Sequence, residues 1–212
     1  FISTFQGLEL ASLSNLNYAE GNLVHHVEKL DRKQCDDWCK ENNVDGASLF
    51  QAAFALTLGR MARTAVPVYC TSYHARVNRK MMKSQGMFVN NVALKAELAS
   101  DQSVADLLQQ LKTDAAEAYA MGRYPFTHMN RELGVVPRVS FNFRPFQQAL
   151  NIGSKKYALS ELPRPTGQTD ISVDIDLIGT DYVISVISSD AVNSAETVRL
   201  FTKALKATLW NM

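Results

Sequence analysis

The sequence has few of the features that mark secreted, membrane-spanning and nucleic-acid-binding proteins. Its three cysteines are an odd and sparse set, which fits a reducing cytosol better than a disulfide scaffold. No apolar run approaches the roughly 20 residues that cross a bilayer, so we expect no membrane partner. Because 22 basic residues nearly balance 21 acidic ones, no global field attracts nucleic acid.

The first residues, Phe-Ile-Ser-Thr-Phe, also lack an initiator methionine, a basic segment and a signal-peptide pattern. We therefore expect a cytoplasmic protein and a piece of a longer chain. The 212 residues are 46% hydrophobic and 20% charged, which suits a globular chain with one large domain or slightly more.

Five segments carry helix signals. Asp31, Ser103 and Ser194 stand where side chains accept N-cap hydrogen bonds, and Gln34 occupies the capping-box position after Asp31. Residues 47–61 are apolar around most of a helical circumference, which is typical of a helix buried against a sheet. The sequence predicts helices over residues 31–42, 47–61, 103–122, 125–133 and 194–209.

Strand signals are interspersed with these helices. They predict strands over residues 5–13, 23–30, 66–75, 87–94, 137–146, 170–178 and 182–188. Residues 147–168, rich in Gly, Ser and Pro, are expected to form a mobile excursion. This order predicts the α/β class, a sandwich in which helices cover a mixed sheet.

One predicted strand carries two polar residues that need an explanation. The apolar run 87–94 follows a basic loop at residues 76–85 and contains Asn90 and Asn91, whose side chains leave opposite faces of a strand. A buried amide costs free energy unless it finds hydrogen-bond partners. At least one asparagine therefore either sits in a bend at the strand end or points beside a ligand channel.

Four motifs in a fixed order resemble the condensation domains of nonribosomal peptide synthetases. The first is an arginine that precedes a Gly-x-Phe-Val-Asn strand, here Arg76 and residues 86–90. The other three are a buried helix at residues 46–56, an aromatic-Pro-Phe turn at residues 123–126 and a phenylalanine-rich strand at residues 139–143. Asp170 also resembles the aspartate that opens a later strand of that family.

The resemblance implies a chloramphenicol-acetyltransferase-like α/β sandwich, in which two similar halves face each other across a tunnel. Residues 1–212 would form a single subdomain, the C-terminal half. The implied tunnel-wall residues are Asn90, Ser140 and Asn142, with Asn91 on the back face. The implied structural motif residues are Arg76, Gly86, Phe88, Pro125, Phe126 and Asp170.

The resemblance also implies a function. Such domains join an acyl or peptidyl thioester on one carrier protein to an amine on another, with phosphopantetheine on the carriers and no cofactor bound directly. The partners are the N-terminal half and the carrier domains. The catalytic His-His-x-x-x-Asp-Gly motif belongs to the other half, so this chain has no catalytic residues of its own and is expected to be inactive alone.

Two other functions fit the same residues. One is half of a coenzyme A-dependent O-acyltransferase, because the sequence does not separate amine from alcohol acceptors. The other is a non-catalytic module that docks carrier proteins. Adenylation and carrier domains downstream would favour peptide synthesis.

Three local patterns resemble functional sites. His25 and His26 start a near-copy of the catalytic motif, but Asp31 comes one residue late and Arg32 replaces the glycine, so a solvated strand is expected. Cys35 and Cys39 lie one helical turn apart, but their spacing matches no common zinc site, and we expect free thiols and no metal. The basic loop 76–83 could meet a phosphopantetheine phosphate, although a solvated loop is the simpler interpretation.

Overall fold

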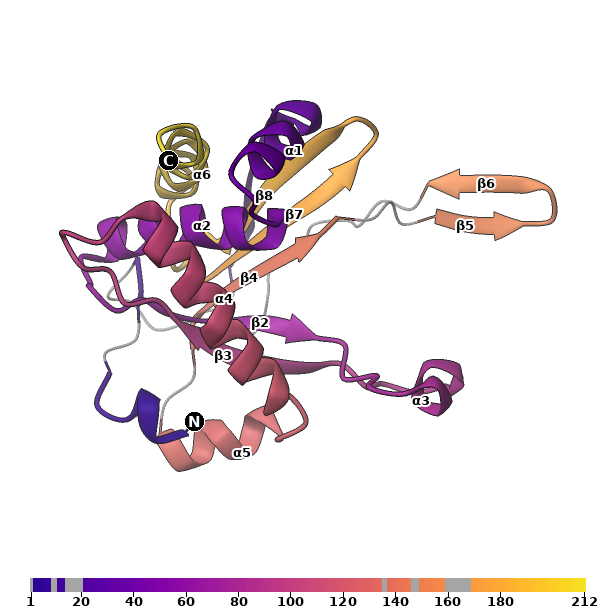
Figure 1. The fold of residues 1–212 in the computed structure, drawn as a ribbon, viewed down its shortest axis with the longest axis horizontal. Coiled ribbons are helices and arrows are strands. Elements are labelled where there is room, and N and C mark those ends of the chain that lie inside the picture. Colours follow the sequence, from indigo (N-terminus) through magenta and orange to yellow (C-terminus); the bar gives the residue numbers. More distant parts are fainter. Residues whose placement is uncertain (1, 9–10, 14–20, 135–136, 146–148, 159–168) are drawn as a thin grey trace.

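The computed structural model describes residues 2–8, 11–13, 21–134, 137–145, 149–158 and 169–212 (Figure 1). Its centre is a six-stranded mixed sheet in the order β1-β8-β7-β4-β2-β3. The pairs β2–β4 and β4–β7 are parallel, and the remaining neighbours are antiparallel. The strands are β1 (Leu23–Asp31), β2 (Val68–Tyr73), β3 (Asn90–Lys95), β4 (Val139–Arg144), β7 (Ile171–Ile178) and β8 (Asp181–Ser189). The predicted α/β class with a mixed sheet is confirmed.

Helices cover one face of this sheet, which we call the helix face. They are α1 (Arg32–Glu41), α2 (Gly46–Ala62), α4 (Val104–Ala120) and α6 (Ala195–Trp210). The predicted caps are in place: Asp31, Ser103 and Ser194 each accept a hydrogen bond from the backbone N–H three residues later. A short helix, α5 (Phe126–Leu133), follows α4 and lies with η1 (Ile2–Phe5) near the β3 side of the sheet. None of the described helices is long and apolar enough to span a membrane.

The core lies between α2 and the sheet. Phe54 of α2 is fully buried and stacks on Phe141 of β4, with ring centroids 4.8 Å apart. Phe50, one turn earlier, packs in the same way on Phe143. The alternating phenylalanines of β4 therefore all point to the helix face, which turns Ser140 and Asn142 to the opposite face.

Two predicted strands differ from the structure. In the described part of residues 5–13 there is no strand: the chain forms η1, and Phe5 packs with Val68, Ala93 and Met129. The strand predicted from residue 87 begins only at Asn90, and Met87 is 89% exposed. The apolar run 87–89 is kept out of the sheet because its backbone belongs to a loop tied to Arg76, described below.

Two elements outside the main sheet were not predicted. The loop expected at 76–85 contains α3 (Arg79–Lys83), and the excursion expected at 147–168 contains a hairpin of β5 (Ala149–Ile152) and β6 (Lys155–Ala158). Both project from the same end of the molecule (Figure 1). The rest of that excursion, residues 147–148 and 159–168, lies outside the described residues.

The parallel strands β2 and β4 are joined less closely than their neighbours. Cys70 and Ser140 form the one residue pair between them, whereas β4 and β7 pair over six positions. Beyond this pair a side chain replaces the backbone ladder: the Asn142 Oδ1 accepts a hydrogen bond from Ser72 N at 3.0 Å. Asn142 therefore connects two strands whose backbones have begun to separate.

Candidate functional site

A ladder of polar side chains runs along β4 and β7 on the face opposite the helices, which we call the polar face. The parallel register sets Ser140 opposite Ser172 and Asn142 opposite Asp174. The two serine hydroxyls lie 2.9 Å apart, and the Asn142 Nδ2 donates to Asp174 Oδ1 at 2.9 Å. Because alternate residues of a strand share a face, two neighbouring parallel strands in register give an unbroken polar row.

The ladder continues at both ends with ion pairs. Arg144 Nε donates to Asp176 Oδ1 at 2.6 Å, and Arg138 Nη2 donates to Asp170 Oδ1 at 2.7 Å. Asp170 is only 1% exposed, and Ser12 also donates to its carboxylate. Arginine forks suit carboxylates geometrically, so these pairs fix the relative positions of β4 and β7. The predicted motif residue Asp170 thus anchors the start of β7.

The polar face extends across the sheet in both directions from this ladder. On one side, Ser72 of β2 donates from its Oγ to Asn91 Oδ1 at 3.4 Å. On the other side, His25 Nε2 lies 2.8 Å from Ser185 Oγ, and Ser185 pairs in register with Asp174. Burial and the neighbouring His26 lower the pKa of His25 below its ordinary value, which favours a neutral imidazole at this position.

The two histidines lie in β1, so the strand predicted for them is confirmed. They point to opposite faces. His26 Nε2 lies 3.6 Å from Glu28 Oε1, and Glu28 accepts a hydrogen bond from Lys206 of α6 at 2.9 Å. His26 therefore belongs to the helix face and not to the polar face.

Asn90, predicted as a tunnel residue, lies away from Ser140 and Asn142. Its Nδ2 donates to the carbonyl oxygens of Gly122 and Tyr124, both at 2.8 Å, and its Oδ1 accepts from Phe126 N at 3.3 Å. One amide thus fastens the turn between α4 and α5 to the start of β3. The polar face carries its neighbour Asn91 instead. The tunnel role of Asn90 stays a prediction, and its contacts give it a structural role.

The turn held by Asn90 contains the predicted Tyr-Pro-Phe motif. Pro125 is the N-cap residue of α5 and offers no side-chain hydrogen bond, so the Asn90 amide accepts from the first helical N–H instead. Phe126 packs beside the small cluster of Phe5, Val68, Ala93 and Met129. Two motifs that are more than 30 residues apart in the sequence therefore form one local unit.

Arg76 organises the loop before β3. Its guanidinium donates to the carbonyl oxygens of Met81, Ser84 and Gly86, the last at 3.0 Å, and lies 4.2 Å from the ring centroid of Phe88. A planar guanidinium can bind several carbonyls and stack on an aromatic ring at once. The spacing between Arg76 and the Gly-x-Phe segment is thus the length of a loop whose carbonyl oxygens and Phe88 ring contact the Arg76 guanidinium.

The three cysteines are buried and free. Burial raises the pKa of Cys35 and of Cys70 to about 12, so both stay protonated. A cysteine binds zinc as a thiolate. Within the described ranges, no cluster of three or more His, Cys, Asp or Glu side chains could hold a metal ion.

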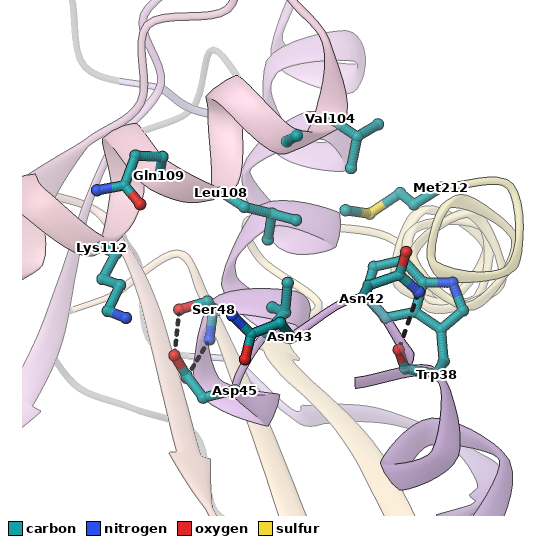
Figure 2. A pocket seen from close by; sticks show the side chains of 12 residues that line it. Trp38, Asn42, Asn43, Asp45, Ser48, Val104, Leu108, Gln109, Lys112 and Met212 are labelled. Atoms are coloured by element: carbon teal, nitrogen blue, oxygen red, sulfur yellow. Dashed lines mark hydrogen bonds between the residues drawn. The ribbon is translucent and has the colours of Figure 1, made fainter. Parts of the chain in front are cut away.

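A hollow that the sequence did not indicate lies on the helix side of the molecule (Figure 2). It has a volume of about 410 Å³ and lies between the end of α1, the start of α2 and the first turns of α4. Trp38, Leu108 and Met212 form its apolar wall, and the side chains of Asn43 and Lys112 lie at its margin. The Asp45 carboxylate at its floor is occupied as the N-cap of α2, where it accepts from Ser48 N and Oγ.

The family is decided by a comparison with models of known domains. The model for the condensation domain matches residues 8–186, which is most of the chain. The chain belongs to the condensation-domain family. The motif order around Arg76 and Tyr124 predicted this family.

Curated relatives agree with this assignment. The condensation-domain chain is 24% identical over 196 residues to surfactin synthase subunit 2 of Bacillus subtilis (strain 168), covering 88% of this chain and 6% of that protein. It is 27% identical over 113 residues to tyrocidine synthase 3 of Brevibacillus parabrevis, covering 52% of this chain and 2% of that protein. The chain thus spans only a few per cent of the length of these relatives.

A solved structure shows the same fold. The first condensation domain of the calcium-dependent antibiotic synthetase, in complex with a substrate analogue, superposes with a TM-score of 0.76 at 16% identity. The match covers 95% of this chain and 46% of that one. Nearly all of this chain is therefore matched, and the match covers about half of the solved chain.

Part of the polar face of this condensation-domain chain does not stand out in its sequence. Asp174, Asp176 and Ser185 were not singled out, although Asp174 and Asp176 alternate with the apolar residues of β7. That alternation shows that both carboxylates leave the same face. Their position beside Asn142 and Arg144 follows only from the register of β4 and β7.

Proposed function

We propose that residues 1–212 form the C-terminal half of a nonribosomal peptide synthetase condensation domain. The whole domain would join an acyl or peptidyl group on one carrier protein to the amine of an aminoacyl group on another. One observation supports the proposal. The chain matches about half of a solved condensation domain and presents a ladder of polar side chains on the sheet face opposite its helices. A second α/β half facing that ladder would enclose a reaction tunnel.

The polar face would form a wall of this tunnel. Ser140 and Asn142 lie at its centre, and Ser172 and Asp174 hold them in place through hydrogen bonds. Side chains held by such partners keep one orientation, which suits a reaction whose main requirement is to place an amine next to a thioester. The phosphopantetheine arms would come from the carrier proteins, and this half would bind no cofactor itself.

The catalytic histidine would lie in the other half. Within this sequence, His25 and His26 are followed by Asp31 and Arg32 and not by the Asp-Gly spacing of the motif. General acid–base or oxyanion assistance from a histidine would therefore reach the tunnel from across the interface. It follows that this half should be inactive alone.

Two measurements test the proposal. In the full synthetase, Ser140→Leu places a larger apolar side chain in the centre of the polar face, and we expect a loss of at least about tenfold in amide formation, because a small misplacement of the reactants is costly. Gln109→Leu, an exposed position on α4, is the matched control and should leave the rate unchanged.

Unfolding temperatures are measured in parallel, so that a folding defect in either variant is detected. Equal condensation rates for the Ser140→Leu and Gln109→Leu enzymes would remove the polar face from the reaction site. A measurable condensation rate from residues 1–212 alone would overturn the assignment of catalysis to the other half.

A further inference from the structure

The hollow on the helix side is bordered by the turn that ends α1 (Figure 2). After α1 the chain forms a Schellman motif, in which Asn43 N donates to Lys40 O at 3.3 Å and Val44 N donates to Cys39 O at 2.9 Å. Asn43 has a φ of 54°, in the left-handed region that this motif requires and that asparagine tolerates better than most residues. The turn between α1 and α2 therefore has one fixed shape.

One side of the hollow is apolar and includes an aromatic ring. Trp38 and Val104 line it and pack against the main core, and Met212, just after α6, does the same. An indole ring attracts a second aromatic ring in a stacked or edge-on arrangement, and a methionine sulfur packs favourably against aromatic rings. The volume of about 410 Å³ lies within the range of roughly 300–1,000 Å³ typical of ligand pockets. Trp38 and Met212 thus favour an aromatic occupant.

The opposite side of the hollow carries a cation without a partner. In Figure 2, Lys112 of α4 lies across the hollow from Trp38 and Met212. Lys112 is exposed and forms no ion pair with any residue that the structure describes. The side-chain amide of Asn43 likewise makes no hydrogen bond within the described ranges. Both groups are therefore available as donors to a ligand.

The acidic lining residue does not cancel this charge. Asp45 is engaged as the N-cap of α2, and its two carboxylate oxygens accept hydrogen bonds from Ser48 N and Ser48 Oγ at 2.9 and 2.8 Å. The positive end of the helix dipole also offsets the negative charge of a carboxylate at this position. The ammonium of Lys112 therefore remains to bind an anionic group.

We propose that this hollow binds a small aromatic carboxylate. The aromatic ring of the ligand lies between Trp38 and Met212, and its carboxylate faces the Lys112 ammonium and the Asn43 amide. Because the Schellman motif fixes the turn in advance, little conformational entropy is lost on binding. The site lies on the helix side of the sheet and not on the polar face, so it is independent of the proposed tunnel.

Fluorine NMR of the full synthetase tests the head group that the hollow selects. The probes are para-fluorophenylacetate, para-fluorophenethylamine and para-fluorophenylethanol, which share one aromatic ring and differ in charge. Line broadening measures binding, because a small molecule bound to a large protein tumbles slowly. In the part of the binding that depends on the hollow, we expect the carboxylate to bind at least about fivefold more tightly than the amine, with the alcohol between them.

A filled hollow identifies this part of the binding. Ala105 is an exposed lining residue of α4, so Ala105→Trp places an indole in the recess. Ala116→Trp puts the same side chain at an exposed position of the same helix, outside the hollow, and serves as the matched control. We expect Ala105→Trp to lower the affinity of the hollow for the carboxylate at least about tenfold and Ala116→Trp to leave it unchanged.

Two variants test the donors. Lys112→Met keeps an apolar stem and should weaken carboxylate binding about threefold without changing that of the alcohol, whereas Lys203→Met, an exposed lysine of α6 outside the hollow, should change neither. Asn43→Gly removes the amide but suits the left-handed turn, so it should weaken binding about twofold in a chain with unchanged unfolding temperature.

Several results would overturn the site. Equal binding by the Ala105→Trp and Ala116→Trp enzymes would place the ligand elsewhere. Tighter binding of the amine than of the carboxylate, or equal binding of all three probes, would reject recognition of an anion. The same losses in Lys112→Met and Lys203→Met would show a general effect of net charge and remove Lys112 from the site.

Discussion

Removing the Asn90 side-chain amide should destabilise the chain more than any nearby surface change. Asn90→Leu keeps a side chain of similar size but deletes two hydrogen bonds to the carbonyls of Gly122 and Tyr124 and one from the N–H of Phe126. A typical hydrogen bond contributes about 1 kcal/mol net, and a buried group left without a partner costs about 1–3 kcal/mol. Because Asn90 is half-buried, we expect a loss of about 2–3 kcal/mol.

The neighbouring residue supplies the control. Asn91→Leu changes the same residue type in the same strand, but Asn91 makes a single long hydrogen bond, 3.4 Å from Ser72 Oγ. Its cost should stay within about 0.5 kcal/mol, because this one hydrogen bond is long and open to solvent. For a chain of this length 1 kcal/mol corresponds to roughly 2–4 °C in Tm, so Asn90→Leu should lower Tm by roughly 5–10 °C and Asn91→Leu hardly at all.

A third variant tests the mechanism. Asn90→Asp keeps the acceptor for Phe126 N but places a carboxylate against two carbonyl oxygens, which raises the pKa of the new carboxyl. A group whose pKa is raised on folding binds a proton more readily in the folded state, so Asn90→Asp should gain stability relative to Asn90→Leu as pH falls below about 5.

The assay is thermal unfolding followed by circular dichroism across pH for all three variants. Equal Tm values for Asn90→Leu and Asn91→Leu would show that the hydrogen bonds of the Asn90 side chain contribute nothing to stability. A pH response of Asn90→Asp that is flat or of opposite sign would refute the account of its carbonyl partners.

Two further predictions concern the buried polar and thiol groups. Asp170→Asn should cost about 2–4 kcal/mol in chemical denaturation, because it removes the charge of a buried carboxylate that pairs with the Arg138 guanidinium, whereas Ser12→Ala, which removes one bond to the same carboxylate, should cost about 1 kcal/mol or less. Similar losses for both variants would contradict the ion-pair account. Cys35 and Cys70 should resist alkylation at pH 8 in the native chain and react once denaturant is added, because burial raises the pKa of both to about 12. Rapid native-state labelling of either thiol would refute their burial.

The helices were predictable because their signals are local. Asp31, Ser103 and Ser194 cap α1, α4 and α6 as expected, since an N-cap depends on residues three positions apart. The apolar circumference of 47–61 likewise predicted that α2 would be buried, and Phe50 and Phe54 have no exposed surface.

The end of a strand was harder to predict because it depends on distant partners. Residues 87–89 are as apolar as a buried strand, yet Arg76, ten residues before Gly86, holds their loop outside the sheet. The same limit applies to Asn90. Alternation shows that Asn90 and Asn91 leave opposite faces, but only the position of the α4–α5 turn reveals that Asn90 is the residue that fastens it.

The polar face was predictable in part. The alternation of β4 set Ser140 and Asn142 together on the side away from the phenylalanines, and the structure places them there. Their partners Ser172 and Asp174 lie 32 residues further along the chain. Nothing in the local sequence sets the register between two parallel strands, so these pairs became visible only in the folded chain.

The single residue pair between β2 and β4 gives the sheet a seam. One leaf consists of β2 and β3, and the other leaf consists of β4, β7, β8 and β1. Across the seam, the hydrogen bond from Ser72 N to Asn142 takes over where the backbone pairing ends. Every other strand pair of the sheet lies within one leaf, so the Cys70–Ser140 pair and this hydrogen bond are what the two leaves share along the seam. The same asparagine that faces the proposed tunnel is thus also a side-chain link between the two leaves.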